Sequence, residues 1–205
     1  CYADLRASSG TLRLFGRNAA ELDRSAVALL RRRVGVVHQN CEFLDHLSVA
    51  ENIALPLTVA GRADEAAQNL PELLNWVGLA AQAGRAPMSL SGGERQRAAL
   101  ARAVIGSPDV VLADEPTGNV DTATSAEILS VLETLNRQDG LTIVLITHEP
   151  DVGQRAQRTL YLRDGRLAFG LAAPAPQPAL AHRLDDTREG DLVETAGGEL
   201  SLAPT

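Results

Sequence analysis

The sequence predicts an α/β fold in which a parallel sheet carries an inserted helical subdomain, and three observations lead to this prediction. Residues 110–113 and 141–146 are unbroken apolar runs, which are typical of strands covered on both faces of a parallel sheet. Residues 44–83 are rich in Ala and Leu at helical spacing, which predicts the insertion. The segment between the two apolar runs has one apolar helical face, as a crossover helix requires: Ile128, Leu129, Leu132 and Leu135.

The amino-terminal part of the chain predicts two strands joined by a helix. Thr11–Phe15 alternates polar and apolar residues before Gly16, which predicts a half-buried strand. Val34–Val37 predicts a more deeply buried strand, and a short helix over Arg24–Arg33 connects the two.

The helical insertion contains its own stop signals. Pro56, Gly61 and Gly78 interrupt the helical pattern and predict breaks between its helices. A further helix is expected to open at Ser91 and to run through Val104.

The carboxyl-terminal half predicts a strand, a helix and a parallel strand, which form a right-handed βαβ unit. Thr124 and Glu127 have the spacing of a capping box, and Asp139-Gly140 predicts the end of the helix. The Asp-Gly pair within Leu160–Leu167 predicts a hairpin.

The predicted parts of the chain follow from these elements. Residues 1–39 and 106–170 form the sheet core, and residues 40–105 form the helical subdomain that ends in the Ser91 helix. Residues 171–205 have little periodicity and too little apolar surface to offset the entropy of ordering. We expect them to be a mostly disordered tail.

Composition excludes several classes of partner. A net charge of -7 disfavours DNA and RNA, so we predict no nucleic-acid partner. Cys1 and Cys41 provide neither a disulfide framework nor metal-ligand spacing, which favours the reducing cytosol. The longest strongly apolar stretch, 141–146, is far shorter than the roughly 20 residues of a membrane-spanning helix.

Two carboxylates follow the predicted strand over residues 110–113. Asp114 is expected at the carboxyl edge of the sheet, where open α/β folds bind their ligands. Because Mg²⁺ takes one or two protein carboxylates and completes its shell with phosphate and water, Asp114 suits a nucleotide-bound magnesium ion. Glu115 remains free to act on a water molecule. On its own, Asp-Glu-Pro can equally end a strand and start a turn.

A glycine pair opens the helix that begins at Ser91. Ser91 and Glu94 can form a capping box, which would satisfy free backbone amides. Gly92 and Gly93 add nothing to such a cap and cost helix stability. Their use is the close approach of backbone amides to an anion at a helix end whose dipole favours negative charge.

Two further polar residues follow predicted strands. His148 comes after the 141–146 strand and can donate to a phosphate oxygen or orient a carboxylate and water. Gln39 follows Val34–Val37, and its amide can ligate a cation or orient water. A lone histidine after a strand, as His148 is, more often has a structural role than a functional one.

In this order, the segments resemble the ATP-binding-cassette ATPase family across about residues 8–170. The resemblance implies a P-loop NTPase-like (RecA-like) core that binds ATP and Mg²⁺ and works as a homodimer. It assigns Gln39 to the Q-loop, Ser91, Gly92, Gly93 and Glu94 to the signature loop, Asp114 and Gln39 to the metal, Glu115 to the general base, Asp121 to the D-loop and His148 to the switch.

One family element is missing from these residues. The phosphate loop G-x-x-x-x-G-K-[ST] requires a lysine, and all 19 basic residues are arginine. We therefore expect an amino-terminally truncated core without its first strand and phosphate loop. We also expect an unpaired sheet edge and exposed apolar surface.

Within the family, several segments most resemble cell-division ATP-binding subunits of the FtsE type, including Phe43–Leu47, Glu51–Leu57 and Pro116–Asp121. Lipoprotein-releasing and macrolide-exporter ATPases share much of this. The resemblance implies an integral membrane partner, an FtsX-like permease docked on the helical subdomain, and a place in the cytoplasm at the inner face of the plasma membrane. Two alternatives stay open: the lipoprotein-release or macrolide-export type, and a catalytically dead interaction protein.

Overall fold

The computed structural model describes residues 9–118, 120–163, 165–169, 192–194 and 200–202. The chain divides into two compact units, Cys1–Val144 and Leu145–Thr205, and each is described by itself. The predicted boundaries after residues 39 and 105 both fall inside the first unit.

A hairpin with strands of two residues each lies near the start of the described part of the first unit. Strands β1 (Arg13–Leu14) and β2 (Arg17–Asn18) pair antiparallel. Phe15 and Gly16 both have positive φ, at 49° and 78°, the conformation that a tight hairpin turn requires. The strand predicted over residues 11–15 is therefore shorter than expected, because the chain turns back at Phe15.

A short helical turn and a helix lead from this hairpin to the sheet. The 3-10 helix η1 spans Ala19–Glu21, and helix α1 spans Arg24–Arg31. The Asp23 carboxylate caps α1 by accepting from Ala26 N at 2.6 Å. The helix predicted over 24–33 is confirmed except for its last two residues, which form the turn into β3.

The sheet core is formed by strands far apart in sequence. Strand β3 (Val34–Val37) pairs in parallel with β4 (Val110–Asp114), with Val34 opposite Val110 and Val37 opposite Ala113. The sheet order is β3, β4, β5, where β5 spans Thr142–Ile146. Helix α5 (Thr122–Gln138) connects β4 to β5. The α/β prediction is confirmed, and the parallel pairing of β3 with β4 agrees with the predicted parallel sheet.

The expected coverage of both faces is wrong for β5. Its residues alternate between half-buried and exposed, and the side chains of Val144 and Ile146 are 45% and 51% exposed. In β4, by contrast, Val111 and Ala113 are fully buried. An apolar run shows what a strand can bury, whereas its actual burial depends on what packs against it. The exposed side chains agree with the expected open apolar surface.

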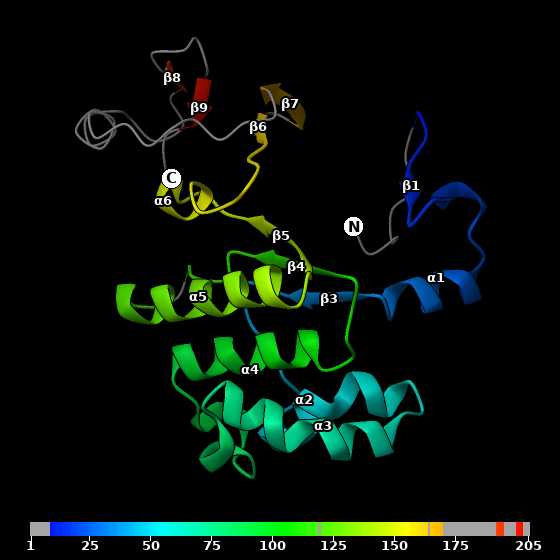
Figure 1. The fold of residues 1–205 in the computed structure, drawn as a ribbon, viewed down its shortest axis with the longest axis vertical. Helices are drawn as coiled ribbons and strands as arrows, with labels where there is room; N and C mark the ends of the chain where they lie inside the picture. The colour runs from blue at the N-terminus through cyan, green and yellow to red at the C-terminus, as the bar shows by residue number, and fades with distance from the viewer. Residues whose placement is uncertain (1–8, 119, 164, 170–191, 195–199, 203–205) are drawn as a thin grey trace. The chain divides into compact units, whose positions relative to one another are not determined.

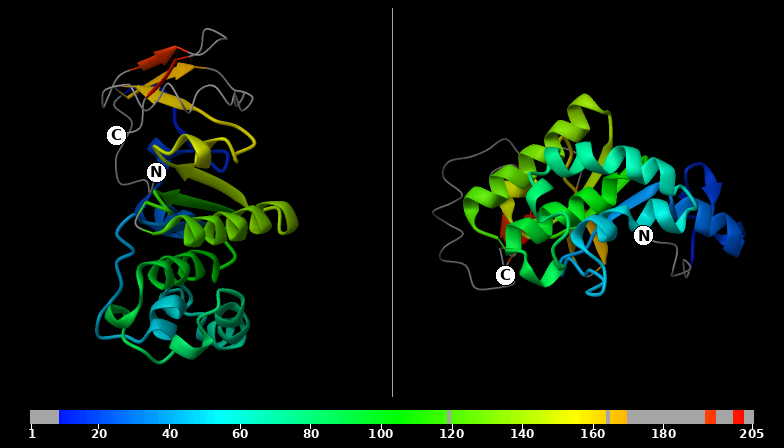
Figure 2. Two further views of the ribbon diagram at one scale, coloured as in Figure 1. Left: turned by 90° about the vertical axis from the view of Figure 1, so that its left-hand side faces the viewer. Right: turned by 90° about the horizontal axis from the view of Figure 1, so that it is seen from below.

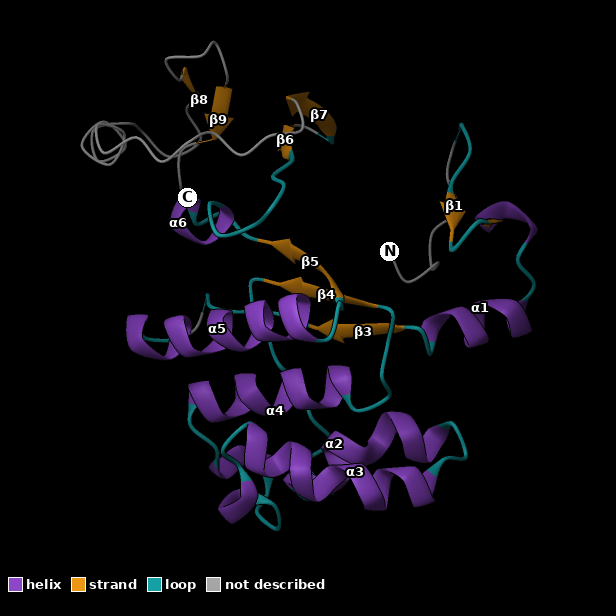
Figure 3. Cartoon of the chain, viewed as in Figure 1, coloured by secondary structure: helices purple, strands orange, loops and turns teal. Residues whose placement is uncertain are grey.

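Between β3 and β4 the chain is helical (Figure 3). Helices α2 (Val49–Val59), α3 (Ala63–Trp76) and α4 (Gly92–Val104) form the subdomain, with 3-10 turns η2 (Ala80–Gln82) and η3 (Pro87–Ser89) before α4. Figures 1 and 2 show α4 between the strands and the α2–α3 pair. The predicted helical subdomain is confirmed.

Two of the three predicted breaks in this subdomain are correct. Gly61 and Gly78 follow α2 and α3 in the left-handed conformation, with φ of 76° and 67°. The break expected at Pro56 is wrong, because α2 continues through it. An interior proline costs a helix about 3 kcal/mol, and the burial of neighbouring Ile53 and Leu57 offsets this cost.

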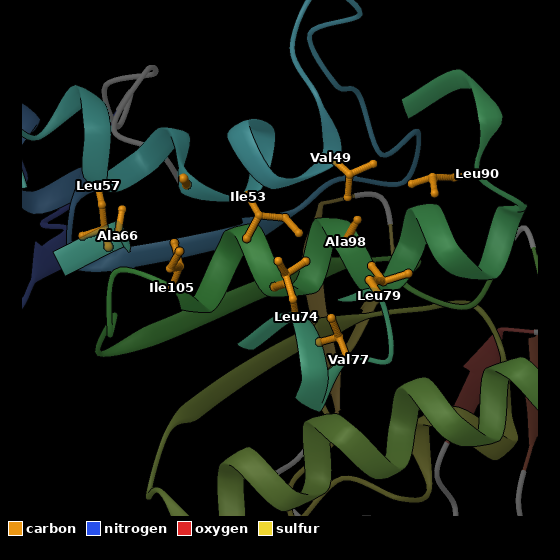
Figure 4. Packing of buried hydrophobic residues seen from close by; sticks show 12 residues of the cluster. Val49, Ile53, Leu57, Ala66, Leu74, Val77, Leu79, Leu90, Ala98 and Ile105 are labelled. Atoms are coloured by element: carbon orange, nitrogen blue, oxygen red, sulfur yellow. The ribbon is translucent and has the colours of Figure 1, made fainter. Parts of the chain in front are cut away.

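The core of the helical subdomain is a cluster of twelve buried residues drawn mainly from α2, α3 and α4. Figure 4 shows Ile53 of α2, Leu74 of α3 and Ala98 of α4 gathered in one layer. Helix α4 also contacts the sheet closely: a Cβ on Gly35 of β3 would lie 2.2 Å from the carbonyl oxygen of Ala103. Helix α4 thus packs against both the sheet and the other helices.

The second unit contains one predicted hairpin and one unexpected one. Helix α6 spans Pro150–Gly153, and β6 (Tyr161–Arg163) pairs antiparallel with β7 (Arg166–Phe169), as predicted. Strands β8 (Leu192–Glu194) and β9 (Leu200–Leu202) also pair antiparallel. These six residues form paired strands, and the expectation that residues 171–205 are mostly disordered stays a prediction. The remainder of 171–205 lies outside the described residues.

Candidate functional site

The parallel register brings two predicted site residues to one edge of the sheet. Val37 lies opposite Ala113, so the chain leaves β3 and β4 at the same edge. Asp114 is the last residue of β4, and Gln39 follows β3 by two residues. Both side chains are exposed. This edge can therefore present a carboxylate and an amide oxygen to the same ligand.

Gln39 lies in a tight turn. Cys41 N donates to the carbonyl oxygen of His38 at 3.0 Å, which closes the turn around Gln39 and Asn40. Cys41 has a φ of 43°, in the left-handed region that residues other than glycine rarely occupy.

Glu115 also has a left-handed backbone, with a φ of 45°. Gly118 N donates to the Glu115 carbonyl at 3.2 Å. A Cβ on Gly118 would lie 3.9 Å from Glu115 Oε2, so the carboxylate lies over this turn. Such strain persists only where the surrounding structure holds it, and it concentrates at functional sites. The buried residues Pro116 and Thr117 anchor this turn.

Residues 91–94, the predicted signature loop, form the capping box that the sequence allowed. The Ser91 hydroxyl accepts from Glu94 N at 3.3 Å, and Glu94 Oε2 accepts from Ser91 N at 2.8 Å. Gln82 Nε2 donates to Glu94 Oε1 at 2.9 Å. The hydrogen bond from the Ser91 backbone, followed by that of its side chain, lowers the pKa of Glu94. Glu94 is therefore held as an anion that fixes the loop.

Gly93 has a packing role that the sequence did not reveal. A Cβ on Gly93 would lie 2.5 Å from Cγ2 of Thr124. The first turns of α4 and α5 therefore approach closely, and a glycine is required there irrespective of any anion.

Asp121, and not Thr124, caps α5. The Asp121 carboxylate accepts from Thr124 N at 3.0 Å and from the Thr124 hydroxyl at 2.7 Å. The backbone hydrogen bond from Thr124 is the main cause that lowers the pKa of Asp121. The predicted capping box of Thr124 and Glu127 is wrong, because Glu127 instead forms an ion pair with Arg97 at 3.5 Å.

Residues 91–94 and the start of α5 line an open hollow of about 590 Å³. Five predicted site residues line it, four from residues 91–94 and the fifth, Asp121, from the start of α5. Its lining residues are Ser91, Gly92, Gly93, Glu94, Arg97, Val120, Asp121 and Thr124. Sequence reasoning missed Arg97, although it follows Glu94 by three residues and so shares its helix face.

His148 belongs to the second unit. It follows β5 after one residue and is exposed. Its predicted convergence with Asp114 and Glu115 stays a prediction.

Neither a metal cluster nor a membrane-spanning helix occurs in the part of the chain that the structure describes. No three His, Cys, Asp or Glu side chains there could hold a metal ion together. No helix there has both the length and the apolar character to cross a bilayer.

Comparison with known proteins decides the family. The family model described as "ABC transporter" matches residues 2–118. The chain belongs to the ABC transporter family. Its fold is the α/β fold of P-loop NTPases. The solved ATP-binding cassette MJ0796, a dimer bound to ADP and Pi, superposes with a TM-score of 0.76 at 30% identity, covering 85% of this chain and 78% of that one.

Several curated relatives of this ABC chain are named after transport. The lipoprotein-releasing system ATP-binding protein LolD of Bordetella pertussis is 44% identical over 162 residues, 78% of this chain and 70% of LolD. The macrolide export ATP-binding/permease protein MacB of Syntrophobacter fumaroxidans is 42% identical over 164 residues, 78% of this chain but 23% of MacB. The methionine import ATP-binding protein MetN of Caulobacter vibrioides is 41% identical over 199 residues, 59% of MetN. The chain thus spans about a quarter of MacB and three fifths of MetN.

Proposed function

We propose that this chain is the ATP-binding and ATP-hydrolysing part of an ABC-type membrane complex. The observation that carries the proposal is the shared sheet edge: β3 and β4 pair in parallel with Val37 opposite Ala113, which brings Gln39 and Asp114 to one side. The family membership and the likeness to the cassette MJ0796 support it.

The donor set at this edge fits a magnesium ion. Asp114 offers an exposed carboxylate and Gln39 an amide oxygen, and Mg²⁺ prefers one or two such ligands together with phosphate oxygens and water. Asp114 and Gln39 would hold the ion, which would neutralise charge on the transferring phosphoryl group.

Glu115 is the proposed general base. Its half-buried carboxylate lies over the Glu115–Gly118 turn, immediately after the magnesium ligand Asp114. It would accept a proton from a water molecule oriented by Gln39, while His148 would donate to the γ-phosphate. The protein contributes mainly position and charge in such a reaction.

Two copies of the chain would form the complete site. The hollow beside the signature loop combines the amino-terminal end of α4 with the D-loop residue Asp121. A helix of thirteen residues presents free amides at this end, which suits the γ-phosphate of a nucleotide held by the second copy. The solved cassette MJ0796 is itself described as dimeric.

The lysine loop is the decisive element for nucleotide affinity. These 205 residues contain no lysine, so we expect the chain by itself to bind ATP weakly. The second candidate is an interaction protein without nucleotide chemistry.

Nucleotide titration separates the two candidates. The chain and a version extended upstream by a strand, a G-x-x-x-x-G-K-[ST] loop and a helix would be titrated with Mg-ATP by calorimetry. We expect weak binding by the chain, tight binding and hydrolysis by the extended version, and tight binding without hydrolysis after Glu115→Gln. An extended version that binds no ATP would refute the ATPase proposal and favour the interaction protein. Tight binding by the chain alone would refute the requirement for the lysine loop.

The membrane partner is proposed to be a permease that docks on the helical subdomain. The names of LolD and MacB, which refer to lipoprotein release and to an ATP-binding/permease protein, favour an export complex. The FtsE-type alternative, with an FtsX-like permease at the inner face of the plasma membrane, rests on the sequence resemblance alone. Depletion in the native cell distinguishes them: filamentous cells support cell division, whereas normal division with retained lipoproteins or macrolide sensitivity supports export.

A further inference from the structure

The turn that carries Gln39 is strained at one residue. Cys41 closes the turn through its backbone N–H, has a φ of 43°, and is buried. The positive φ is uncommon for a residue that is neither glycine, Asn nor Asp, so surrounding contacts must hold it. These contacts come from α4, more than fifty residues later in the sequence.

Two consecutive residues of α4 bind Cys41 directly. The Cys41 thiol donates to Oε1 of Gln96, and Arg95 Nη2 donates to the Cys41 carbonyl at 3.3 Å. Arg95 also donates through Nη1 to the carbonyl of Pro87 at 3.2 Å, so its guanidinium is fixed at both ends. Both the side chain and the backbone of Cys41 are therefore held.

A third residue of α4 holds the next part of the segment. Arg102 Nη1 donates to the carbonyl of Glu42 at 2.7 Å. Its guanidinium lies 4.6 Å from the centroid of the Phe43 ring, and that of Arg95 lies 5.5 Å from it. These distances permit cation–π attraction. Helix α4 thus contacts three successive residues, Cys41, Glu42 and Phe43.

The stability of the fold alone does not explain why a glutamine stands at position 96. Its side chain is 4% exposed, and its Nε2 has no hydrogen-bond partner among the described residues. A buried donor without a partner is unfavourable, whereas an apolar side chain of similar volume would avoid that cost. The contact with the Cys41 thiol provides a reason for an amide at this position.

We propose that Arg95, Gln96 and Arg102 are positioning residues that hold Cys41 in its left-handed conformation and so set the turn presenting Gln39. We call the contacts of these three side chains with residues 41–43 the clasp. Through the clasp, helix α4 controls where Gln39 lies. Its consequence for ATP hydrolysis rests on the proposed function, but the clasp itself does not. A movement of α4 would be transmitted to the Gln39 turn through the contacts of these side chains with residues 41 and 42.

The Cys41 thiol reports directly on this clasp. Burial is the main cause that raises its pKa, and the nearby guanidinium groups of Arg102 and Arg95 lower it less. While residues 41–43 lie against α4, the Cys41 thiol is rarely in its reactive thiolate form. The rate of Cys41 alkylation therefore measures how often these residues leave α4. Peptide mapping by mass spectrometry separates Cys41 from Cys1.

The test compares Gln96→Leu with the unmodified full chain. We expect Cys41 alkylation and amide exchange at Asn40 and Cys41 to become about fivefold faster, the equivalent of one hydrogen bond of about 1 kcal/mol. The free energy of unfolding should stay the same or rise, because the unpartnered donor is removed. Arg62→Gln is the matched control: it removes an exposed ion pair with Glu65 on α3 and should change neither rate.

A second variant separates positioning from general loosening. In Cys41→Gly the left-handed conformation carries no strain, so adding Gln96→Leu should not accelerate exchange at Asn40 further. The proposal is overturned if Gln96→Leu leaves alkylation and exchange unchanged, or if exchange accelerates evenly over the whole first unit. Because no readout uses ATP, failure of the proposed ATPase function leaves this test intact.

Discussion

The helical subdomain and the sheet edge differ in how completely they bury their apolar residues. Ile53 at the centre of the helical cluster is 0% exposed, whereas Val144 of β5 is 45% exposed. Both lie in strongly apolar sequence. The helices bury their faces against one another, since α2, α3 and α4 are neighbours in the chain and in space. The strand depends on whatever covers it, so apolar sequence predicts burial well in the first case and poorly in the second.

The largest expected effect tests this difference directly. Ile53→Ala should lower the free energy of unfolding by about 3 kcal/mol, because it loses buried surface and leaves a cavity. Val144→Ala should lower it by less than about 1 kcal/mol, because half of the side chain already contacts water. Urea unfolding followed by circular dichroism measures both values.

Equal losses for Ile53→Ala and Val144→Ala would contradict the comparison. They would show that Val144 is covered in solution, for example by a second copy, and dilution of the protein should then reduce the effect of Val144→Ala.

An intermediate effect is expected where α4 meets α5. Gly93→Ala places a Cβ 2.5 Å from Cγ2 of Thr124 and should lower stability by about 1–3 kcal/mol through overpacking. Adding Thr124→Ser removes that methyl group and should restore most of the loss.

Gly84→Ala provides the matched control for Gly93→Ala, because no atom lies within 4 Å of the added Cβ. Its stability should change little. If Thr124→Ser fails to rescue Gly93→Ala, the requirement for glycine comes from backbone freedom and not from the contact between the helices.

The smallest effect concerns acid and the helix caps in both regions. Hydrogen bonds from Ser48 lower the pKa of Glu51 in the helical subdomain, and those from Thr124 lower the pKa of Asp121 beside the sheet. Each cap therefore contributes fully above the unfolded pKa values of about 4, and its contribution is lost as pH falls through the lower folded value. Free energies of unfolding measured from pH 7 to 3 should be flat at first and then fall.

Glu51→Gln and Asp121→Asn should each weaken this dependence on pH. A dependence that survives both substitutions unchanged would assign the acid sensitivity to other carboxylates.

Local signals predicted much of the fold and part of the site. The valines of β3 and β4, the stop signals Gly61 and Gly78, and the Ser91–Glu94 spacing each act within a few residues, so the sequence reveals them. The break predicted at Pro56 was wrong because the packing of α2 outweighs the cost of the proline. The cap predicted at Thr124 was wrong because Asp121 caps α5 instead.

Contacts between distant segments could not be predicted. Nothing near Gly93 in the sequence indicates Thr124, and nothing near Gln39 indicates that Gln96 will hold the adjoining Cys41. Arg97 had a local signal, its spacing from Glu94, but its partner Glu127 lies thirty residues away.

The amino acids alone determined most of the secondary structure, the family resemblance and the residue types offered to a nucleotide, because hydrophobic period, capping and turn chemistry operate over short stretches of chain. The tertiary structure alone decided which of those residues share a sheet edge, why Gly93 must lack a side chain, and how α4 holds the Gln39 turn. These features depend on the parallel register and on the packing of helices, where contacts of a few ångströms join segments that the linear order keeps apart.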